Sequence, residues 1–144
     1  MRKVLFITSS RADYGLLRDV IIETQKLNKE TYLLVTGSHL SDEFGNTIKE
    51  IKKDNIKKIL IRNILDKKFK DKKISDYLSK AIKITTGVID KKKPDVIVIL
   101  GDRYELLGSA IAAMILRTPI AHIHGGELTT GAYDDSIRHS ITKL

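Results

Sequence analysis

Four short clusters in this sequence of 144 residues combine glycine with side chains that carry charge or exchange protons. In chain order they are Ser9–Gly15, Gly37–Gly45, Gly101–Arg103 and His124–Glu127. A further group follows the last cluster and consists of Asp134, Asp135, Arg138 and His139. Carboxylates beside arginine and histidine can bind an anion and move protons. The clusters therefore predict acid–base chemistry on a small, polar, anionic ligand.

Short apolar runs rich in β-branched residues precede these clusters and predict the strands that position them. We expect strands at Lys3–Thr8, Thr31–Thr36, Asp95–Leu100 and Ile120–Ile123, and a weaker one without a following cluster at Lys58–Arg62. In a parallel α/β sheet, ligands bind beyond the carboxyl ends of the strands. We therefore expect the clusters to share one edge of a sheet, with mostly lysines and prolines at the opposite edge.

Apolar residues at helical spacing separate the predicted strands. The expected helices cover Gly15 to about Asn28, Asn46–Asp54, Ser75–Asp90 and Glu105–Leu116, and a last one starts near Asp134. This alternation predicts a doubly wound, parallel α/β sheet in a single domain over residues 1–144. The last helix reaches Leu144 without a Gly, Asn or Pro to end it, so we expect an N-terminal part of a longer chain.

The net charge of +8 comes from one stretch of the chain. Between Ile51 and Lys93 there are 15 Lys and Arg against five Asp, with the densest run at Lys67–Lys73. Arginine, which reads bases and phosphates better than lysine, occurs there only as Arg62. The pattern favours a solvated, lysine-rich surface over a face that binds nucleic acid or an acidic membrane.

Composition excludes several classes of protein. Hydrophobic residues make up 42% of the chain, enough for a core, which excludes wholesale disorder. The absence of cysteine excludes a disulfide scaffold, a thiolate metal site and a cysteine nucleophile. No apolar run approaches the ~20 residues that span a bilayer, and the apolar start is typical of a strand, not of a secretory signal. We therefore expect a cytoplasmic protein without a membrane segment.

The first cluster suits an anion but lacks the usual nucleotide-binding motifs. Arg11 precedes a predicted helix, where it could hold a phosphate or form an ion pair with Asp13. Ser9, Ser10 and Gly15 do not make a G-x-G-x-x-G motif, and the lysine of a P-loop is absent. The cluster favours a phosphate clamp over a loop that holds a whole nucleotide.

The later clusters each have a structural and a functional interpretation. Asp102 and Arg103 could pair with each other or face a ligand from the strand end. The pair Gly125–Gly126 could admit a ligand close to the backbone or form a turn. One of Asp134 and Asp135 is expected to cap the following helix, which leaves the other free for chemistry.

The histidines do not predict a metal site. His122 lies within a predicted strand and is expected to be a core histidine with its hydrogen bonds satisfied. His39, His124 and His139 come from separate loops without ligand spacing. No G-x-S-x-G motif is present to supply a serine nucleophile. What remains is acid–base chemistry by carboxylates, arginine and histidine.

Four segments, taken together and in order, resemble the UDP-N-acetylglucosamine 2-epimerase family, and above all its hydrolysing branch, which makes N-acetylmannosamine for sialic-acid-type sugars. The segments are TSSRADYGLL at 8–17, VTGSHLSDEFGNT at 35–47, GDRYELLGSAIAA at 101–113 and HIHGGELTTGAYDDSIRHSITKL at 122–144. The resemblance implies two Rossmann-like domains in the glycosyltransferase-B arrangement. This chain would be the N-terminal domain, and the C-terminal domain, with much of the uridine and diphosphate binding, would lie outside it.

The reaction implied by the resemblance is loss of UDP followed by hydration. Cleavage of the C1–O bond acidifies the proton on C2, and a carboxylate base removes it to leave a 2-acetamido-glycal. A second acid returns a proton to the other face of C2, and water adds at C1. The products are UDP and N-acetylmannosamine or a close 2-acetamido sugar. The resemblance implies no metal, no redox cofactor and a homo-oligomer when the protein is full length.

Residue by residue, the resemblance assigns Arg11 to the diphosphate, Asp102 and Asp134 to catalysis, and Arg103 and His39 to the site. We expect the substrate also to contact Asp13, Gly15, Gly125, Gly126, Asp135 and Arg138.

Two positions depart from the family pattern. Many members have Glu where this chain has His124, so either His124 or Glu127 would be the second acid–base group. A lysine that some members place five residues after the Arg11 position is Leu16 here. The diphosphate would therefore depend more on Arg11 and on the second domain.

Three other functions remain open at this point. The non-hydrolysing branch of the same family passes through the same glycal but adds UDP back. A stand-alone module that binds a sugar or an anion would need no catalysis, and we expect the 144-residue chain alone to be inactive because part of the diphosphate clamp is missing. Nucleic-acid binding is the third class, and the lysine-rich pattern disfavours it.

Overall fold

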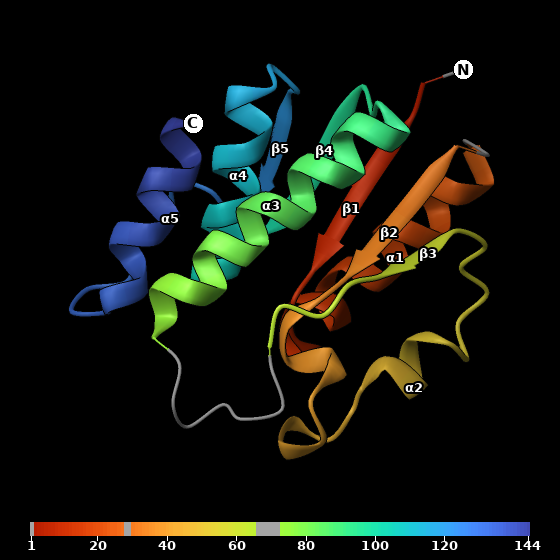
Figure 1. Cartoon of the computed structure of the whole chain (residues 1–144), viewed down its shortest axis with the longest axis horizontal. Helices are drawn as coiled ribbons and strands as arrows, with labels where there is room; N and C mark the ends of the chain where they lie inside the picture. Colours follow the sequence, from red (N-terminus) through yellow and green to blue (C-terminus); the bar gives the residue numbers. More distant parts are fainter. Residues whose placement is uncertain (1, 28–29, 66–72) are drawn as a thin grey trace.

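The computed structural model describes residues 2–27, 30–65 and 73–144. Its elements are β1 (Val4–Thr8), α1 (Arg11–Leu27), β2 (Thr31–Val35), α2 (Ile48–Ile51), β3 (Ile59–Ile61), α3 (Ile74–Lys92), β4 (Val96–Leu100), α4 (Tyr104–Ile115), β5 (Ile120–Ile123) and α5 (Tyr133–Lys143). Two short 3-10 turns, Gly37–Leu40 and Asp42–Phe44, lie between β2 and α2. The predicted alternation of strands and helices is confirmed (Figure 1).

The described strands pair in parallel, in the order β3-β2-β1-β4-β5. The chain builds outward from β1 through β2 to β3, and then crosses back to place β4 on the other side of β1. The connections after β1 and β4 therefore leave the sheet in opposite directions, and such a switch point is where open α/β sheets bind ligands. The predicted doubly wound sheet is confirmed, with its switch point between β1 and β4.

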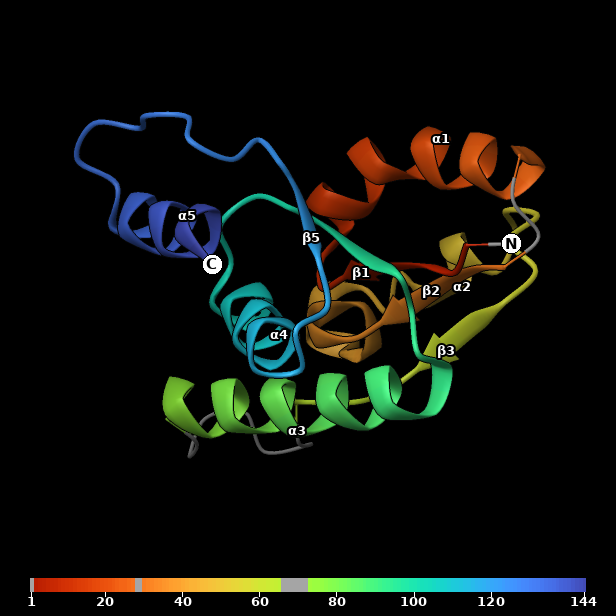
Figure 2. The same cartoon turned by 90° about the horizontal axis from the view of Figure 1, so that it is seen from above.

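Helices cover both faces of the sheet (Figure 2). α1 lies on one face, whereas α3 and α4 lie on the other, with α5 beside α4. Successive strand residues point to opposite faces, so β1 supplies both cores. Phe6 packs in one cluster with Leu17 and Ile21 of α1, and Ile7 packs in the other with Ala110 of α4. Near-continuous apolar strands such as β1 and β4 are typical of a parallel sheet buried on both faces.

The helices α3 and α4 approach closely because residue 108 is glycine. A Cβ atom at Gly108 would lie 2.9 Å from the Cβ of Ala81 and 3.0 Å from the carbonyl oxygen of Leu78. Helical spacing predicts an apolar stripe on α3 made of Tyr77, Leu78, Ala81, Ile82, Thr85, Val88 and Ile89. Five of these residues are buried, and Leu78 and Ile82 are half-buried. This contact fixes α4, and with it the strand-to-helix connection that precedes α4.

Two helices have a boundary that lies more than two residues from the predicted one. α1 starts at Arg11 and not at Gly15, so most of the first cluster forms the first turn of a helix. The helix predicted at Asn46–Asp54 shortens to Ile48–Ile51, although both isoleucines are buried as expected.

Asp54 gives a physical reason for the short α2. Its carboxylate accepts hydrogen bonds from two side chains of α1, Tyr14 (2.5 Å) and Arg18 (2.7 Å). These contacts draw the chain after Ile51 toward α1 and away from a helical path.

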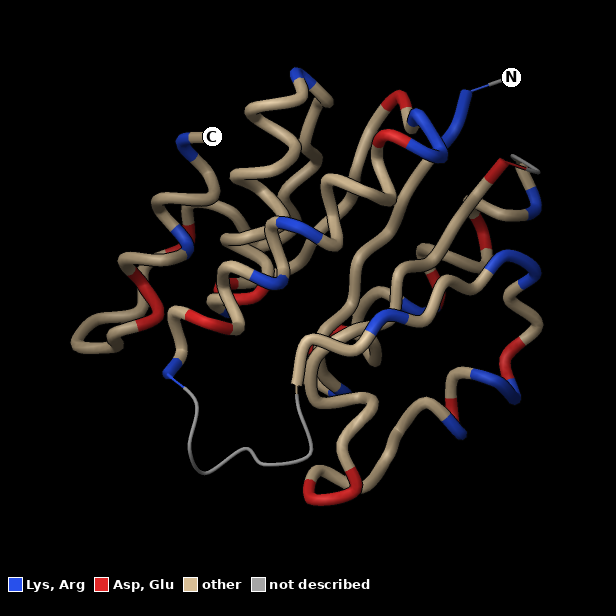
Figure 3. Tube along the Cα trace, viewed as in Figure 1, with Lys and Arg blue, Asp and Glu red and all other residues tan. Residues whose placement is uncertain are grey.

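Most of the cationic residues belong to the middle of the chain, between residues 51 and 93 (Figure 3). Lysines occur along α3, in α2 and in the segment that follows α2, whereas the acidic residues at the start of α5 lie on the β5 side of the sheet. The lysines predicted to form the densest part of this surface, Lys67, Lys68, Lys70 and Lys72, lie outside the described residues. Among the helices that are described, none is long and apolar enough to cross a membrane.

Candidate active site

A cavity of about 260 Å³ opens at the carboxyl edge of the sheet, where the connections after β1 and β4 diverge. Its lining comprises Ser10, Ala12, Asp13 and Leu16 after β1, Leu100, Gly101, Asp102 and Arg103 at the end of β4, and Asp134 of α5. Segments far apart in the sequence thus meet at one place, as the strand ends predict.

Asp13 organises the connection after β1. Its buried carboxylate accepts the backbone N–H groups of Ser9 (3.1 Å) and Ser10 (3.0 Å), both serine hydroxyls (3.0 Å each) and the hydroxyl of Thr8. Burial raises the pKa of the Asp13 carboxyl, and these donors oppose the rise. Asp13, which was expected to bind substrate, therefore has both carboxylate oxygens engaged by its own loop and shapes the wall of the cavity.

Ser10 and Asp13 also start α1. The Ser10 hydroxyl lies 3.4 Å from the backbone N–H of Asp13, and the Asp13 carboxylate accepts the backbone N–H of Ser10. Such a reciprocal capping box fixes the first turn of a helix and leaves its remaining N–H groups facing outward. The Ser-x-x-Asp spacing in the sequence could have located this helix start.

Arg11 does not line the cavity. Its exposed guanidinium lies 3.4 Å from the carboxylate of Glu50, so it pairs neither with Asp13 nor with another group of the cavity wall. Ser10 and Ala12, on either side of it, do line the cavity. Gly15 is exposed on α1 with open space where a side chain would stand.

His39 lies beneath the first loop and is fully buried. Because Thr8 donates its hydroxyl hydrogen to Asp13, the Nε2–H of His39 donates to Thr8 (2.9 Å), and Nδ1 then accepts from the hydroxyl of Thr47 (2.7 Å). Burial lowers the pKa of His39 to about 4, with the nearby Arg103 guanidinium adding to the effect. The arrangement favours a neutral histidine that supports the Asp13 loop over one that contacts substrate.

Asp102 and Arg103 do not pair with each other. Arg103 donates to the fully buried carboxylate of Glu105 from Nε (3.2 Å) and Nη2 (3.0 Å), and 40% of its side chain remains exposed. Glu105 was not predicted to belong to the site, and it holds the Arg103 guanidinium at the cavity wall. The carboxylate of Asp102 forms its ion pair with a different residue.

That partner is Arg138 of α5. Its Nη2 donates to Oδ2 of Asp102, and its Nη1 donates to the hydroxyl of Thr129 (2.9 Å) and the carbonyl of Glu127 (3.2 Å). Oδ1 of Asp102 makes no hydrogen bond within the described part of the chain. Arg138 was expected to bind substrate, but its terminal nitrogens are engaged by the protein, and it orients Asp102 instead.

The glycine-rich connection after β5 is anchored to α5. The Gly126 N–H donates to the hydroxyl of Thr142 (3.1 Å), which also lies 3.0 Å from Nδ1 of His122. Nε2 of His122 donates to the carbonyl of Gly101 (2.7 Å). Gly125 passes so close that a Cβ atom would lie 2.8 Å from Nδ1 of His122. His122 has its hydrogen bonds satisfied as expected, but only half-buried, and it ties the end of β4 to α5.

Within the same connection, His124 and Glu127 form a pair. Nδ1 of His124 lies 2.6 Å from Oε1 of Glu127, and both side chains are partly exposed. His124 has a φ of 59°, in the left-handed region that residues other than glycine rarely adopt.

Asp134 and Asp135 differ sharply in their surroundings. Neither is the N-cap that was expected, because the residue before α5 is Ala132, and it makes no side-chain capping bond. The Asp135 carboxylate accepts the backbone N–H of Thr129 (2.9 Å) and lies 3.3 Å from Nε2 of His139. Asp134 is exposed, faces the cavity and makes no hydrogen bond or ion pair within the described ranges. Asp134 is therefore the aspartate that is free for chemistry.

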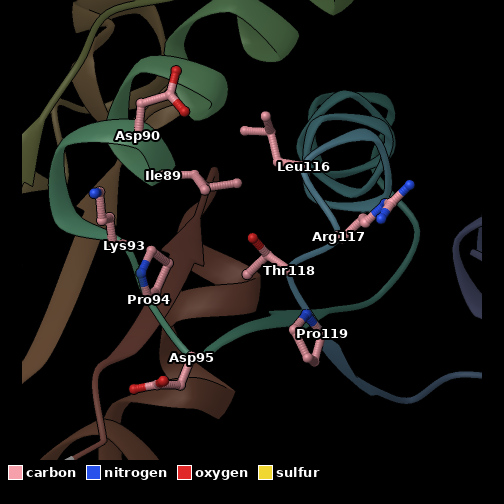
Figure 4. Close-up of a pocket in the computed structure, with 9 residues that line it drawn as sticks. All are labelled: Ile89, Asp90, Lys93, Pro94, Asp95, Leu116, Arg117, Thr118 and Pro119. Carbon is pink, nitrogen blue, oxygen red and sulfur yellow. The ribbon is translucent and has the colours of Figure 1, made fainter.

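A larger hollow, of about 430 Å³, lies at the opposite edge of the sheet (Figure 4). It is bordered by the end of α3 and the start of β4 on one side and by the end of α4 and the start of β5 on the other. Asp90, Lys93, Asp95 and Arg117 surround it, so its charges are mixed. No group of three or more metal-ligating side chains occurs anywhere in the described residues.

The geometry of the 260 Å³ cavity suits proton transfer to a polar ligand. Two carboxylates, Asp102 and Asp134, enter it from different elements, and Arg103 supplies positive charge on the same wall. The start of α5 adds the partial positive charge of a helix N-terminus near Asp134. Two carboxyl groups and a guanidinium thus line one small cavity, an arrangement that can support acid–base chemistry.

The sequence profile of the UDP-N-acetylglucosamine 2-epimerase family matches residues 22–144. Among curated relatives, the GDP/UDP-N,N'-diacetylbacillosamine 2-epimerase (hydrolyzing) of Campylobacter jejuni is 42% identical over 144 residues, which are 99% of this chain and 37% of that protein. The UDP-N,N'-diacetylbacillosamine 2-epimerase (hydrolyzing) of Legionella pneumophila is 37% identical over 145 residues, which are 100% of this chain and 38% of that protein. The chain therefore spans little more than a third of these relatives.

Solved structures agree on the fold. The UDP-GlcNAc 2-epimerase of Methanocaldococcus jannaschii, crystallised in complex with UDP-GlcNAc and UDP, superimposes with a TM-score of 0.80 at 24% identity. The match covers 98% of this chain and 38% of that one. The chain therefore superimposes on little more than a third of that structure.

Proposed function

This chain belongs to the UDP-N-acetylglucosamine 2-epimerase family, and on that premise we propose that the full-length protein is a hydrolysing 2-epimerase. It would convert a UDP-linked 2-acetamido sugar into UDP and the free sugar with inverted C2, of the kind used for sialic-acid-type sugars. The relatives named as hydrolysing enzymes support this reading over the non-hydrolysing one. The observation that carries the proposal is the cavity in which Asp102, Arg103 and Asp134 meet at the switch point of the sheet.

We assign the first half-reaction to the two aspartates. Asp102, oriented by Arg138, removes the proton from C2 through its unengaged Oδ1, and the C–H electron pair forms the C1=C2 double bond. The C1–O bond breaks with its electron pair on the diphosphate oxygen, and Asp134 gives that oxygen a proton. Arg103 and the N-terminus of α5 lie where they can stabilise the departing negative charge.

The second half-reaction hydrates the glycal. Water adds its oxygen to C1 and loses a proton to Asp134, which is now a carboxylate. The π electrons of the double bond take a proton at C2 from the face opposite Asp102. Asp102 then releases the abstracted proton to solvent, and the group that protonated C2 regains a proton from solvent, so the hydrogen at C2 of the product originates from water.

The rest of the substrate would be held by parts of the protein beyond these residues. The cavity walls carry few groups for a uridine, and Arg11 is turned toward Glu50. We therefore propose that a second domain binds the nucleotide and completes the site, and that residues 1–144 form the sugar-facing domain. Assembly of the full-length protein into a homo-oligomer stays part of this proposal.

The test uses the full-length protein in D₂O with UDP-N-acetylglucosamine and, in parallel, UDP-N,N'-diacetylbacillosamine. We expect NMR to find UDP and a free reducing sugar in equal amounts, with inverted C2 and deuterium at that carbon. A UDP-linked epimer without free sugar would assign the protein to the non-hydrolysing branch. Rapid UDP release by residues 1–144 alone would contradict the need for a second domain.

A further inference from the structure

We infer that His124 and Glu127 act as a dyad that returns the proton to C2, with the His124 imidazole as the acid at the sugar and Glu127 as the residue that positions it. The inference rests on the proposed function and assigns roles to two residues that the sequence leaves as alternatives. It starts from the contact between Nδ1 of His124 and Oε1 of Glu127, at 2.6 Å.

The contact determines which ring nitrogen is available. A carboxylate can only accept a hydrogen bond, so Nδ1 of His124 carries the hydrogen that it shares with Glu127. Nε2 makes no hydrogen bond within the described part of the chain. A histidine held at one nitrogen by a carboxylate and open at the other is the arrangement that acid–base catalysis uses elsewhere.

The backbone holds both members of the dyad in place. His124 keeps its left-handed conformation because the next two residues are anchored, Gly125 against His122 and Gly126 to Thr142. The carbonyl of Glu127 accepts a hydrogen bond from Arg138 at 3.2 Å. A residue other than glycine in the left-handed region costs about 1 kcal/mol or more, and such strain is commonly found where a side chain must be aimed.

The pairing of strands brings the dyad next to Asp102. Leu100 of β4 pairs with Ile123 of β5, and the Gly101 N–H donates to the carbonyl of Ile123 at 3.1 Å. His124 therefore follows Ile123 as Gly101 follows Leu100, one residue before Asp102 on the neighbouring strand. Arg138 connects the two directly, because one guanidinium bonds both the Asp102 carboxylate and the Glu127 carbonyl.

This placement suits a reaction that moves protons on two faces of one carbon. Asp102 takes the proton from one face of C2, and the Nε2–H of His124 supplies a proton to the other. The C1=C2 π pair forms the new C–H bond, the N–H pair stays on Nε2, and the neutral imidazole regains its proton from solvent. The charged groups linked to the dyad by hydrogen bonds are Arg138, which bonds the Glu127 carbonyl, and Asp102, which Arg138 also bonds.

The first experiment separates elimination from hydration in the full-length protein with UDP-N-acetylglucosamine. In His124→Gln we expect UDP release to fall less than tenfold, while formation of the free sugar falls about 100-fold or more and the glycal accumulates. Two outcomes would overturn the inference: sugar and UDP in equal amounts at the wild-type rate, or UDP release that falls as steeply as sugar formation with no glycal.

A second experiment tests Glu127 as a positioning residue. Glu127→Gln is expected to raise the fraction of glycal among the products and to lower kcat for its hydration about tenfold. His124→Glu, which places the residue common in the family, is expected to restore hydration and to move the alkaline limb of its pH profile to lower pH, because a carboxylic acid loses its proton more readily than an imidazolium.

The double variant decides whether the two residues act together. If Glu127 works through the imidazole, Glu127→Gln has no effect on hydration once His124 has become Glu. Equal effects of Glu127→Gln in both backgrounds would show that Glu127 acts independently and would overturn the dyad. A wild-type protein that releases no free sugar would instead reject the proposed function, so the two failures are distinguishable.

Discussion

The guanidinium of Arg138 bonds the carboxylate of Asp102 although the two residues lie 36 positions apart. The bond joins α5 to the end of β4, and it leaves Oδ1 of Asp102 open to the cavity. Asp102 thus has a defined orientation before any substrate arrives, which is what proton abstraction at a fixed carbon requires.

Replacement of Arg138 by lysine is expected to lower kcat about 10- to 100-fold. A single ammonium cannot hold Asp102, Thr129 and the Glu127 carbonyl together, and a lost charge-assisted hydrogen bond costs about 1.5–3 kcal/mol. Steady-state kinetics of the full-length protein check this, with Arg117→Lys at the opposite edge as the matched control. Equal kcat values for the two variants would contradict the orienting role of Arg138.

Asp102→Asn and Asp134→Asn are each expected to reduce turnover about 100-fold or more, because both remove a proton-transfer group while keeping its size. Asp90→Asn, at the opposite edge of the sheet, should leave turnover unchanged. UDP release measured with a coupled assay is a sufficient readout. Wild-type turnover in both active-site variants would remove the proposed mechanism.

Thr142→Val is expected to slow turnover about tenfold, whereas Thr142→Ser should stay close to wild type. The valine removes the hydroxyl that accepts the Gly126 N–H and contacts His122, and a hydrogen bond contributes about 0.5–1.5 kcal/mol. Serine keeps that oxygen. If serine slows the reaction as much as valine does, the hydroxyl of Thr142 does not explain the effect.

Gly125→Ala should destabilise the loop by about 1–3 kcal/mol and impair activity, since the new methyl group meets the ring of His122 and the Thr142 hydroxyl. Gly87→Ala provides the control, because nothing lies within 4 Å of a Cβ atom there. Alanine in the middle of α3 is expected to stabilise by up to about 1 kcal/mol. Thermal unfolding of both variants measures the contrast, and an equally stable Gly125→Ala protein would refute the close packing.

His39 predicts a loss of stability in mild acid. Its pKa falls from 6.5 to about 4 on folding, so between these pH values the unfolded chain binds a proton that the folded chain does not. The contribution of neutral His39 to the free energy of unfolding, about 3 kcal/mol in total, is complete above pH 6.5 and is lost as pH falls toward 4. Urea unfolding at pH 7 and pH 4.5 should show a smaller difference for His39→Gln than for wild type.

The sequence predicts the sheet and the gathering of polar residues at its carboxyl edge well because both depend on local patterns. Apolar runs such as Asp95–Leu100 identify buried parallel strands, and the polar residues after them must gather at one edge. Burial of Ile48 and Ile51 was likewise predictable from their spacing, even though the helix around them is short.

Contacts between distant side chains could not be predicted in this way. Nothing near Asp102 in the sequence indicates Arg138 as its partner, and Arg11 was expected to face a phosphate but lies against Glu50. The roles of Glu105 and Thr142 depend on how helices pack on the sheet, which local patterns do not specify. The start of α1 is different, since Ser10 and Asp13 carry a readable capping signal.

One face of α5 carries Asp134, Arg138 and Thr142, spaced four residues apart, so that they stand above one another along the helix. Through these three side chains α5 places Asp134 at the cavity, orients Asp102 through Arg138 and anchors the glycine-rich loop through Thr142. Inserting one residue between them would turn the downstream part by about 100° and break their alignment. The positions of these three side chains therefore depend on one another through the geometry of a single helix.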